Sequence, residues 1–491
     1  MKISKLFTIG LLIFNSIAYN NSGNKMNAQT LVKTDSNGFN YEEFPRPKHV
    51  NYANLIENLR TQQGQELSYV PNNDENSFEL SYIFDMGRHH NKKLKYALKY
   101  MNFLGTDKLT GQEIKNKFHN LGIKYKSRVL SNKTILTISG VKKNLEEGVL
   151  LLEDLLNNVV SDESSYKKYL ESVYNSRKNR AQRRIEVSLI AFDPLSVFGE
   201  NSPYRDIIQY PELKKMDPEE FVNIIKDLKN FKNRFFYNGS DPKLILDILN
   251  KHHRVPKEFK NYNKPKIYNP IKIGGKVYVI NNPSNEVEVA FITGTTEYSV
   301  ENLVLSKLLT YYYGHGQIVN KLRLEENLVT MAHGGIFMLE SHEGIRDFHM
   351  ENFFQTDLNG LSKSLSLMKG FLKDMEEDNE LFERSKKQLL KEYSEERVTN
   401  SRIFWRNDLI KEGKFTSRHY YPQELYDITK KITIKDLKNF YNKSIKDHKF
   451  DVMVYGDLSK IDLDQFKEFG EIKEIDLNYL FNFSDEIKIE Q

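Results

Sequence analysis

The chain has 491 residues, which is too long for a single hydrophobic core and suits two to four domains. Its apolar content of 39% and charged content of 28% are those of an ordinary folded protein. The 72 basic and 67 acidic residues are spread along the whole chain without a basic block, so we expect no nucleic-acid binding. The absence of cysteine excludes a disulfide framework and a lipid-anchored N-terminal cysteine.

The N-terminus has the pattern of a secretory signal. Lys2 and Lys5 precede an apolar run over residues 6–19 that is too short to span a bilayer. We predict a signal peptide over residues 1–28 and a disordered leader over residues 29–44, with an uncleaved anchor as the alternative. No later segment approaches the length of a membrane span, so we expect a secreted, periplasmic protein without stable membrane insertion.

Strands and helices alternate after the leader. Residues 66–70 and 77–86 have the alternating apolar pattern of strands, and Asn72-Asn73-Asp74 predicts the turn between them. Further elements are a helix with a Thr110–Glu113 capping box, strands within residues 123–141, an amphipathic helix at 142–159, a charged helix at 163–184, a helix beginning at Pro218, a strand at 234–237 and a helix opened by Asp241-Pro242.

A short apolar helix over residues 95–106, closed by Gly105, follows the strand at 77–86. Tyr96, Lys99 and Tyr100 fall at positions i, i+3 and i+4, so their side chains share one helical face. This is the spacing of a helical metal site, but none of the three residues is a zinc ligand.

The order of elements begins again in the second half. Tyr69-Val-Pro-Asn-Asn73 matches Tyr278-Val-Ile-Asn-Asn282 at an offset of 209, and Gly105 and Gly314 have the same offset. We therefore predict an α+β fold of two tandem homologous domains, each a mainly antiparallel sheet packed with helices. Their predicted ranges are 45–255 and 273–491, with a Pro- and Lys-rich linker at 256–272.

The run Tyr96-Ala-Leu-Lys99-Tyr100-Met-Asn-Phe-Leu-Gly105-Thr resembles the zinc helix of the pitrilysin/insulinase peptidases, which include the mitochondrial processing peptidases. That family has His-x-x-Glu-His followed by Met-x-Phe-x-Gly-Thr on this helix. The resemblance covers nearly all of the chain after the leader. The sequence is more similar to the second half of a double-length bacterial member than to a catalytic first half. The resemblance implies tandem α+β domains that form half of a clamshell.

The resemblance also implies what the substitutions remove. In active members two imidazoles and a distal glutamate hold zinc, and the central glutamate is the general base. Tyr96 and Tyr100 stand at the imidazole positions here and Lys99 at the base position, while the distal glutamate falls at Asn175 or Ser176. We therefore expect no metal and no cofactor, and we interpret both tyrosines as packing residues whose hydroxyls reach water or backbone.

A second family feature is an arginine followed seven residues later by a tyrosine that contacts substrate. Arg323 matches the arginine, preceded by a Gly314-His-Gly-Gln turn, and Thr330 stands at the tyrosine position. The resemblance implies that these two residues contact substrate. The alternative is a surface arginine paired with Glu325 or Glu326.

Histidine pairs offer weaker candidates. His89-His90 and His252-His253 lack a companion carboxylate motif and are interpreted as solvated loop pairs. His333, His342 and His349 form a loose group with Glu343, but Arg346 occupies the place of the second histidine in His-Glu-x-x-His.

The leading hypothesis is a peptidase-like chain without its own zinc site. It would enclose an extended peptide together with a homologous, zinc-bearing peptidase subunit. One alternative is a stand-alone scaffold or peptide-binding protein. The other is an active metalloendopeptidase with ligands outside the family motif.

Overall fold

The computed structural model describes residues 44–341, 344–411 and 422–489, of which those from Arg46 onward belong to one unit. The predicted signal peptide lies outside the described residues, and so does the predicted leader except for Phe44. No helix within these described ranges is long and apolar enough to cross a membrane.

Six strands form the first sheet: β1 (Glu57–Arg60), β2 (Glu66–Pro71), β3 (Ser77–Phe84), β5 (Ile123–Val129), β6 (Thr134–Val141) and β8 (Asn233–Gly239). Their order is β1-β2-β8-β3-β6-β5, with β2 and β8 parallel and the other neighbours antiparallel. The two strands predicted on either side of the turn are β2 and β3, and β8 lies between them. That insertion involves a strand much later in the chain, so no local pattern could reveal it.

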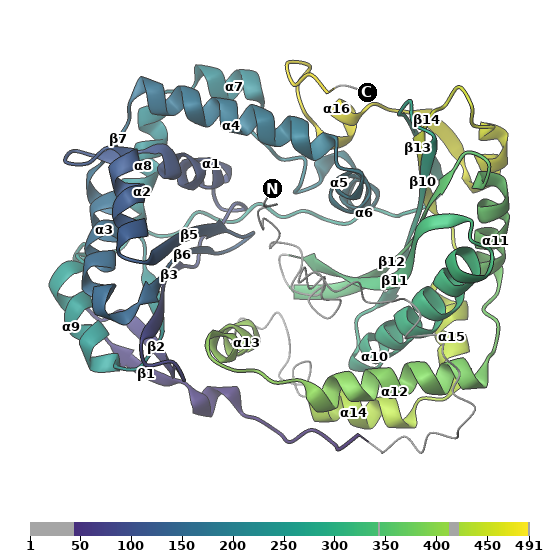
Figure 1. The fold of residues 1–491 in the computed structure, drawn as a ribbon, viewed down its shortest axis with the longest axis horizontal. Coiled ribbons are helices and arrows are strands. Elements are labelled where there is room, and N and C mark those ends of the chain that lie inside the picture. The colour runs from purple at the N-terminus through teal and green to yellow at the C-terminus, as the bar shows by residue number, and fades with distance from the viewer. Residues whose placement is uncertain (1–43, 342–343, 412–421, 490–491) are drawn as a thin grey trace. The chain divides into compact units, whose positions relative to one another are not determined.

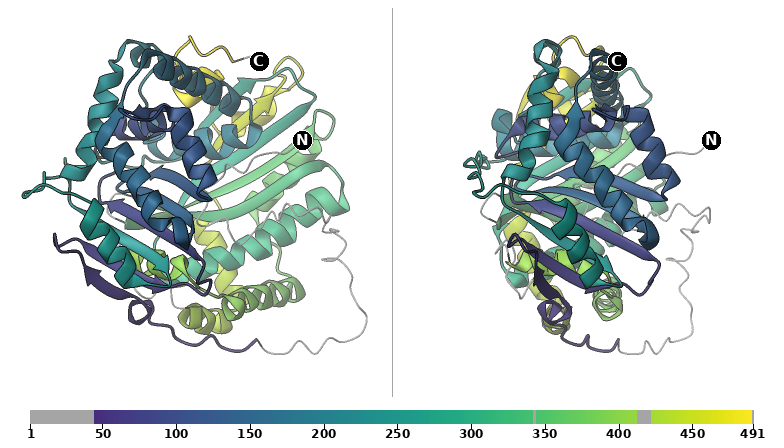
Figure 2. Two further views of the ribbon diagram at one scale, coloured as in Figure 1. Left: turned by 60° about the vertical axis from the view of Figure 1, so that its left-hand side comes forward. Right: turned by 90° about the vertical axis from the view of Figure 1, so that its left-hand side faces the viewer.

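Helices contribute to the core on one face of the first sheet, with α7 (Tyr210–Lys215) supplying Leu213 and six longer helices supplying more residues. Figure 1 and Figure 2 show helices beside this sheet. The six longer helices are α1 (Lys92–Tyr100), α2 (Gly111–Asn120), α3 (Leu145–Asn158), α4 (Glu163–Ala181), α8 (Pro218–Asp227) and α9 (Pro242–His252). The predicted capping box at the start of α2 is present, since Thr110 and Glu113 exchange hydrogen bonds. The alternation along β3 places Phe78, Leu80, Tyr82 and Phe84 in the same core.

Five strands of the second sheet follow the same order as five strands of the first, and the sixth, an edge strand, differs because it comes last in the chain and is parallel to its neighbour. Its strands are β9 (Lys276–Asn281), β10 (Glu286–Glu297), β11 (Val329–Ser341), β12 (Gly344–Asp357), β13 (Asp451–Gly456) and β14 (Glu471–Glu474). From one edge they run β14-β9-β13-β10-β12-β11, and the parallel pair β9 and β13 corresponds to β2 and β8. The predicted α+β class is therefore confirmed, with mixed sheets that pack against helices.

Helices of the second half bury one face of the second sheet. They are α10 (Val300–Leu309), the π-helical segment η9 (Thr310–Glu325), α11 (Leu361–Lys373), α12 (Asn379–Glu395), α14 (Pro422–Lys431) and α15 (Ile434–Ser444). The other face of this sheet packs against residues of α4, the π-helical segment η6 (Val187–Phe192), α6 (Asp193–Phe198) and α16 (Leu477–Phe481).

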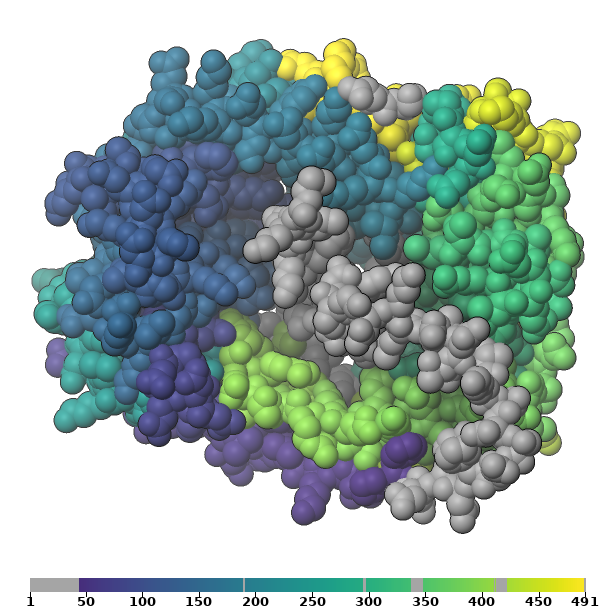
Figure 3. Space-filling view, in the orientation of Figure 1, coloured from purple at the N-terminus to yellow at the C-terminus, as the bar shows by residue number. Residues whose placement is uncertain are grey.

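The other face of the first sheet contacts a helix from the second half, α13 (Ser401–Lys411). Phe404 stacks on Phe236 with ring centroids 4.2 Å apart. Figure 3 shows the light-green atoms of this region beside the purple atoms of the first elements, in agreement with contacts of α13 to β2 and to the 3-10 helix at Tyr52–Leu55. Each half thus supplies helical residues to the sheet of the other.

The helix predicted at residues 95–106 has different bounds in the structure. It begins at Lys92, because the Asn91 side chain caps it by accepting a hydrogen bond from the Lys93 amide. It ends at Tyr100 and continues as a 3-10 turn, Met101–Phe103. Gly105 does not close the helix but pairs with Val160 in a two-residue strand, and a Cβ there would lie 2.3 Å from the Leu109 carbonyl oxygen. Glycine is needed for this close backbone approach.

Candidate functional site

Helix α1 carries the residues that the sequence singled out. Leu94, Ala97 and Leu98 are buried in the core, so Lys95, Tyr96 and Lys99 belong to the less buried side of the helix. Helix α4 contacts α1, and Figure 1 shows α4 running beside it. Residues of α4 and of the loop that follows it therefore surround the positions that the resemblance aligns with the zinc motif.

Tyr96 is held by an arginine and a backbone amide. Its hydroxyl accepts a hydrogen bond from the Ile208 amide at 3.0 Å and a longer one from Arg177 Nη2 at 3.4 Å. Arg177 Nη2 also donates to the Ile208 carbonyl at 2.6 Å, which closes a ring of contacts. Burial raises the pKa of Tyr96 above its ordinary value, so the phenol keeps its proton at neutral pH.

Tyr100 is a core residue. It is fully buried among aromatic rings, with centroid distances of 5.3 Å to Tyr166, 5.2 Å to Tyr169 and 6.3 Å to Phe221. Its hydroxyl donates to the Asp162 carbonyl at 3.4 Å, and burial raises the pKa of the phenol. This geometry matches the packing interpretation of the sequence and leaves no metal-binding orientation.

Two lysines of α1 have lowered pKa values. Lys99 is exposed to water, yet its surroundings remove part of its hydration, and that loss together with the charges of Arg180 and Arg177 lowers its pKa. Lys95 is partly buried, and desolvation followed by the charges of Lys99, Arg88, Arg180 and Arg177 lowers its pKa to about 7. The site is therefore strongly electropositive.

Arg177 of α4 donates a hydrogen bond to Tyr96 of α1, and the sequence analysis did not identify it. Glu171, Asn175 and Ser176 are all exposed, so neither the predicted distal position nor the nearby carboxylate points at Tyr96. Arg177 belongs instead to the buried face of α4, together with Tyr169 and Val173. The spacing of these three residues by four positions was the available signal, because it places an arginine on an apolar stripe.

These residues do not fit zinc. Protonated phenols are poor donors to zinc at neutral pH, and nearby lysine and arginine side chains repel a divalent cation. Within the described ranges, no group of three or more histidine, aspartate or glutamate side chains could hold a metal ion. No catalytic step through zinc can be derived for α1.

Arg323 and Thr330 belong to elements of the second half of the chain and not to α1. Arg323 is exposed at the end of η9, and Thr330 is exposed on β11, where its hydroxyl donates to the Gln355 carbonyl at 3.3 Å. The ion pair proposed for Arg323 is wrong, since Glu325 and Glu326 pair with Lys321 instead.

The glycine-rich turn predicted ahead of Arg323 is also wrong. Gly314 lies inside the π-helical segment, where a Cβ would approach the Gly334 carbonyl oxygen to 1.8 Å. The glycine therefore allows this segment to touch β11 rather than forming a turn.

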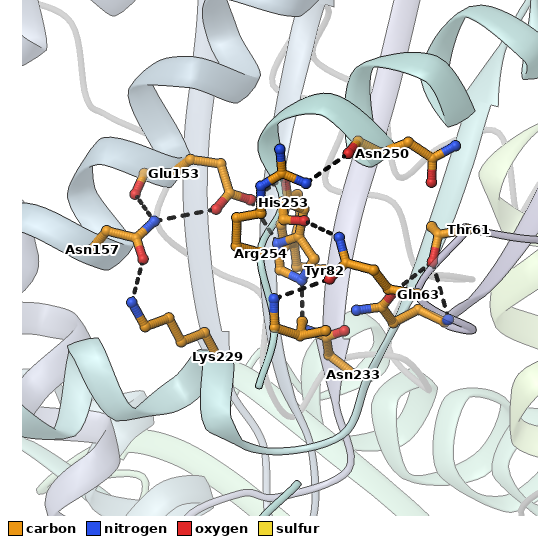
Figure 4. Close-up of polar contacts among 12 residues, drawn as sticks. Thr61, Gln63, Tyr82, Glu153, Asn157, Lys229, Asn233, Asn250, His253 and Arg254 are labelled. Carbon is orange, nitrogen blue, oxygen red and sulfur yellow. Dashed lines mark hydrogen bonds and ion pairs between the residues drawn. The ribbon is translucent and has the colours of Figure 1, made fainter. Parts of the chain in front are cut away.

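His253 is part of a buried polar network and not of a solvated loop, contrary to the sequence interpretation. Figure 4 shows its ring between Glu153 and Asn233, with His253 Nδ1 at 2.8 Å from Glu153 Oε1 and Nε2 at 3.1 Å from Asn233 Nδ2. The Tyr82 hydroxyl donates to the same glutamate oxygen at 2.9 Å. These contacts satisfy polar groups that link β3, α3, β8 and the end of α9.

The other histidines named in the sequence analysis contact different groups. His252 contacts Glu146 at 2.8 Å, and His90 Nδ1 accepts a hydrogen bond from the Gly87 amide. His349 lies 3.0 Å from Asp193, whereas the ring of His333 lies 6.1 Å from that of His315. His342 and Glu343 fall outside the described residues.

No family model and no curated protein matches the sequence of this chain. Solved structures match its fold. The M16 peptidase inactive domain from Pseudomonas fluorescens has a TM-score of 0.58 and 12% identity, and the match covers 82% of this chain and 98% of that chain.

Two longer proteins match as well. The ferredoxin protease FusC, in complex with Arabidopsis ferredoxin, has a TM-score of 0.61 and 13% identity over 83% of this chain. The periplasmic protease PqqL from Escherichia coli has a TM-score of 0.58 and 10% identity over 84% of this chain. The match covers 46% of the FusC chain and 46% of the PqqL chain. The predicted resemblance to the M16, pitrilysin-like peptidases is thus confirmed at the level of the fold.

Proposed function

Because the chain has the fold of the M16 peptidases but carries Tyr96, Lys99 and Tyr100 on α1, we propose that it is a non-catalytic, peptide-enclosing subunit. The observation that carries this proposal is the Tyr96–Arg177–Ile208 ring of contacts. This ring places hydrogen-bond donors and cations at the helix that resembles the zinc helix. None of these groups can activate a water molecule as a metal does.

The partner in this proposal is a homologous chain with an intact zinc site. The two halves of this chain support the proposal, because five strands of each sheet share one order, as expected of tandem domains at 45–255 and 273–491 with a linker at 256–272. Two such domains would form half of a clamshell, and the match to about half of FusC and of PqqL agrees with a chain that is completed by a second one. An enclosed peptide would be held in extended form along such a chamber.

Export is the second part of the proposal. The charged and then apolar start of the sequence supports a signal peptide at 1–28 and a periplasmic location, and one neighbour in structure, PqqL, is described as periplasmic. Arg323 and Thr330 remain proposed contacts to the peptide, supported by their exposure on η9 and β11.

Co-purification tests the subunit proposal. The tagged chain is isolated from its native cell under mild conditions, and bound chains are identified by mass spectrometry. We expect stoichiometric recovery of a second M16-fold chain that contains His-x-x-Glu-His. Recovery of this chain alone, with extended peptides bound to it, would contradict the subunit proposal and favour the stand-alone scaffold.

A further inference from the structure

Five cations gather where α1 faces α4, and we call them the cationic cluster: Lys95 and Lys99 of α1, Arg177 and Arg180 of α4, and Arg88 in the turn after β3. The four charges that act on Lys95 are all positive. Like charges held this close repel each other and weaken the folded state unless something compensates for them. The sequence keeps them together nevertheless.

One neighbouring carboxylate pairs with Arg180 of the cluster, and another is engaged outside it. Glu186 pairs with Arg180 at 2.6 Å and with Arg183 at 3.2 Å. Asp206 pairs with Lys266 at 2.7 Å and accepts a hydrogen bond from the Tyr268 hydroxyl at 2.7 Å. Within the described part of the chain, Lys95, Lys99 and Arg177 therefore have no carboxylate partner.

Arg177 lacks an acceptor for part of its guanidinium group. Only 6% of the residue is exposed, and Nη2 makes the hydrogen bonds to Ile208 and Tyr96. Nη1 is buried and finds no acceptor among the described residues, although the guanidinium lies 5.6 Å from the centre of the Phe483 ring. A buried charged donor without an acceptor is costly, so the structure points to an acceptor that comes from outside.

Water can reach the cluster. Lys99 is exposed and Lys95 is partly exposed, so both residues are open to water on the side of α1 that does not pack into the core. Lys99 and Lys95 are thus more exposed than Arg177, which is buried. Guanidinium and ammonium groups together are well suited to a carboxylate.

We infer that the cationic cluster binds a carboxylate of the enclosed peptide, at the helix where the resemblance places a zinc ion. The inference rests on the proposed function and adds the class of peptide: one whose acidic group is held by Lys95, Lys99 and Arg177. The carboxylate comes either from an aspartate or glutamate side chain or from the C-terminus of the peptide. In both cases the chain replaces the attraction of a metal for an oxygen with that of fixed cations.

Peptide binding to the purified full chain tests this inference by fluorescence anisotropy. Three labelled, unstructured peptides of equal length serve as probes: an acidic one with an amidated C-terminus, a neutral one with a free C-terminus, and a neutral one with an amidated C-terminus. We expect the fully neutral peptide to bind most weakly. Preference for the first peptide assigns the carboxylate to side chains, and preference for the second assigns it to the C-terminus.

Substitutions on α1 test whether the cationic cluster causes the preference for a peptide with a carboxylate. Lys99→Gln and Lys95→Gln each weaken the favoured peptide about two- to fivefold and leave the neutral amidated peptide unchanged. Lys93→Gln is the matched control, because Lys93 lies on the same helix but pairs with Glu220. It should alter no affinity.

The binding results distinguish failure of the anion site from failure of peptide enclosure. Equal binding of all three peptides, unaffected by Lys99→Gln, overturns the anion site and leaves peptide enclosure standing. Absence of binding by every peptide overturns both.

Discussion

Arg177 contacts Tyr96 directly from α4 and bridges it to Ile208. Desolvation is the largest cause of the lowered pKa values of Lys95 and Lys99, and the charges of Arg180 and Arg177 lower both values further. The substitution Arg177→Leu removes one positive charge and keeps an apolar side chain beside Phe483. We expect the pKa of Lys95 to rise toward its ordinary value, as followed by NMR titration of labelled lysine side chains.

The control for this titration is Lys168→Leu, an exposed lysine on the same helix. It should leave the Lys95 titration where it is in the wild-type chain. An unchanged Lys95 pKa in Arg177→Leu would show that Arg177 does not act on the cluster.

Lys95 also makes stability depend on pH. Its pKa in the folded chain is about 7, below the ordinary lysine value that applies when the chain is unfolded. Between these two values the unfolded chain binds more protons, so the destabilisation by this group is complete below pH 7 and decreases as pH rises from 7 toward the ordinary lysine value. Lys95→Met should therefore stabilise the chain relative to wild type at pH 6, with a smaller gain at pH 9.

Urea unfolding at the two pH values measures that difference. Lys93→Met serves as the reference, because Lys93 lies on the same helix and is paired with Glu220. A gain from Lys95→Met that stays constant between pH 6 and pH 9 would contradict the lowered pKa.

Helix α13 is the element through which the second half contacts the first sheet. Asp408 of this helix forms a buried ion pair with Lys133 at 2.5 Å and a second with Arg234 at 2.8 Å. Phe404 adds an apolar contact by stacking on Phe236. Buried charges fix the position of the helix, whereas the aromatic stack supplies the favourable burial of apolar surface.

The chain has one tryptophan, Trp405, and it reports on this helix. Its ring lies 4.8 Å from the ring of Phe404 and 5.8 Å from that of Phe236. Phe404→Ala should shift the Trp405 emission to longer wavelength, because the indole gains contact with water, and should cost about 3 kcal/mol of unfolding free energy. Arg402→Ala, at an exposed position of α13, should change neither. An unchanged emission in Phe404→Ala would show that this stack does not hold the helix in place.

Local elements could be predicted well from the sequence. The capping box of α2, Pro218 at the start of α8 and the alternation in β3 are each formed by residues only a few positions apart in the sequence. Backbone geometry and apolar periodicity determine the structure of such short segments. The positions of β8, α13 and Arg177 depend on contacts between distant segments, which no short pattern contains. The same limit explains why His253 was interpreted as solvated, since Glu153 and Tyr82 reach it from other elements.

At the scale of the whole molecule, the proposed function is peptide binding without hydrolysis by a chain that has the M16 fold. The purified chain should bind an unstructured, fluorescently quenched peptide, and it should show no cleavage that a metal chelator removes. The most direct measurement is therefore hydrolysis of this peptide by the chain alone, in zinc-containing buffer with and without chelator. We expect equal, background signals in both samples. Chelator-sensitive hydrolysis by the chain alone, together with about one zinc ion bound per chain, would contradict the proposed function.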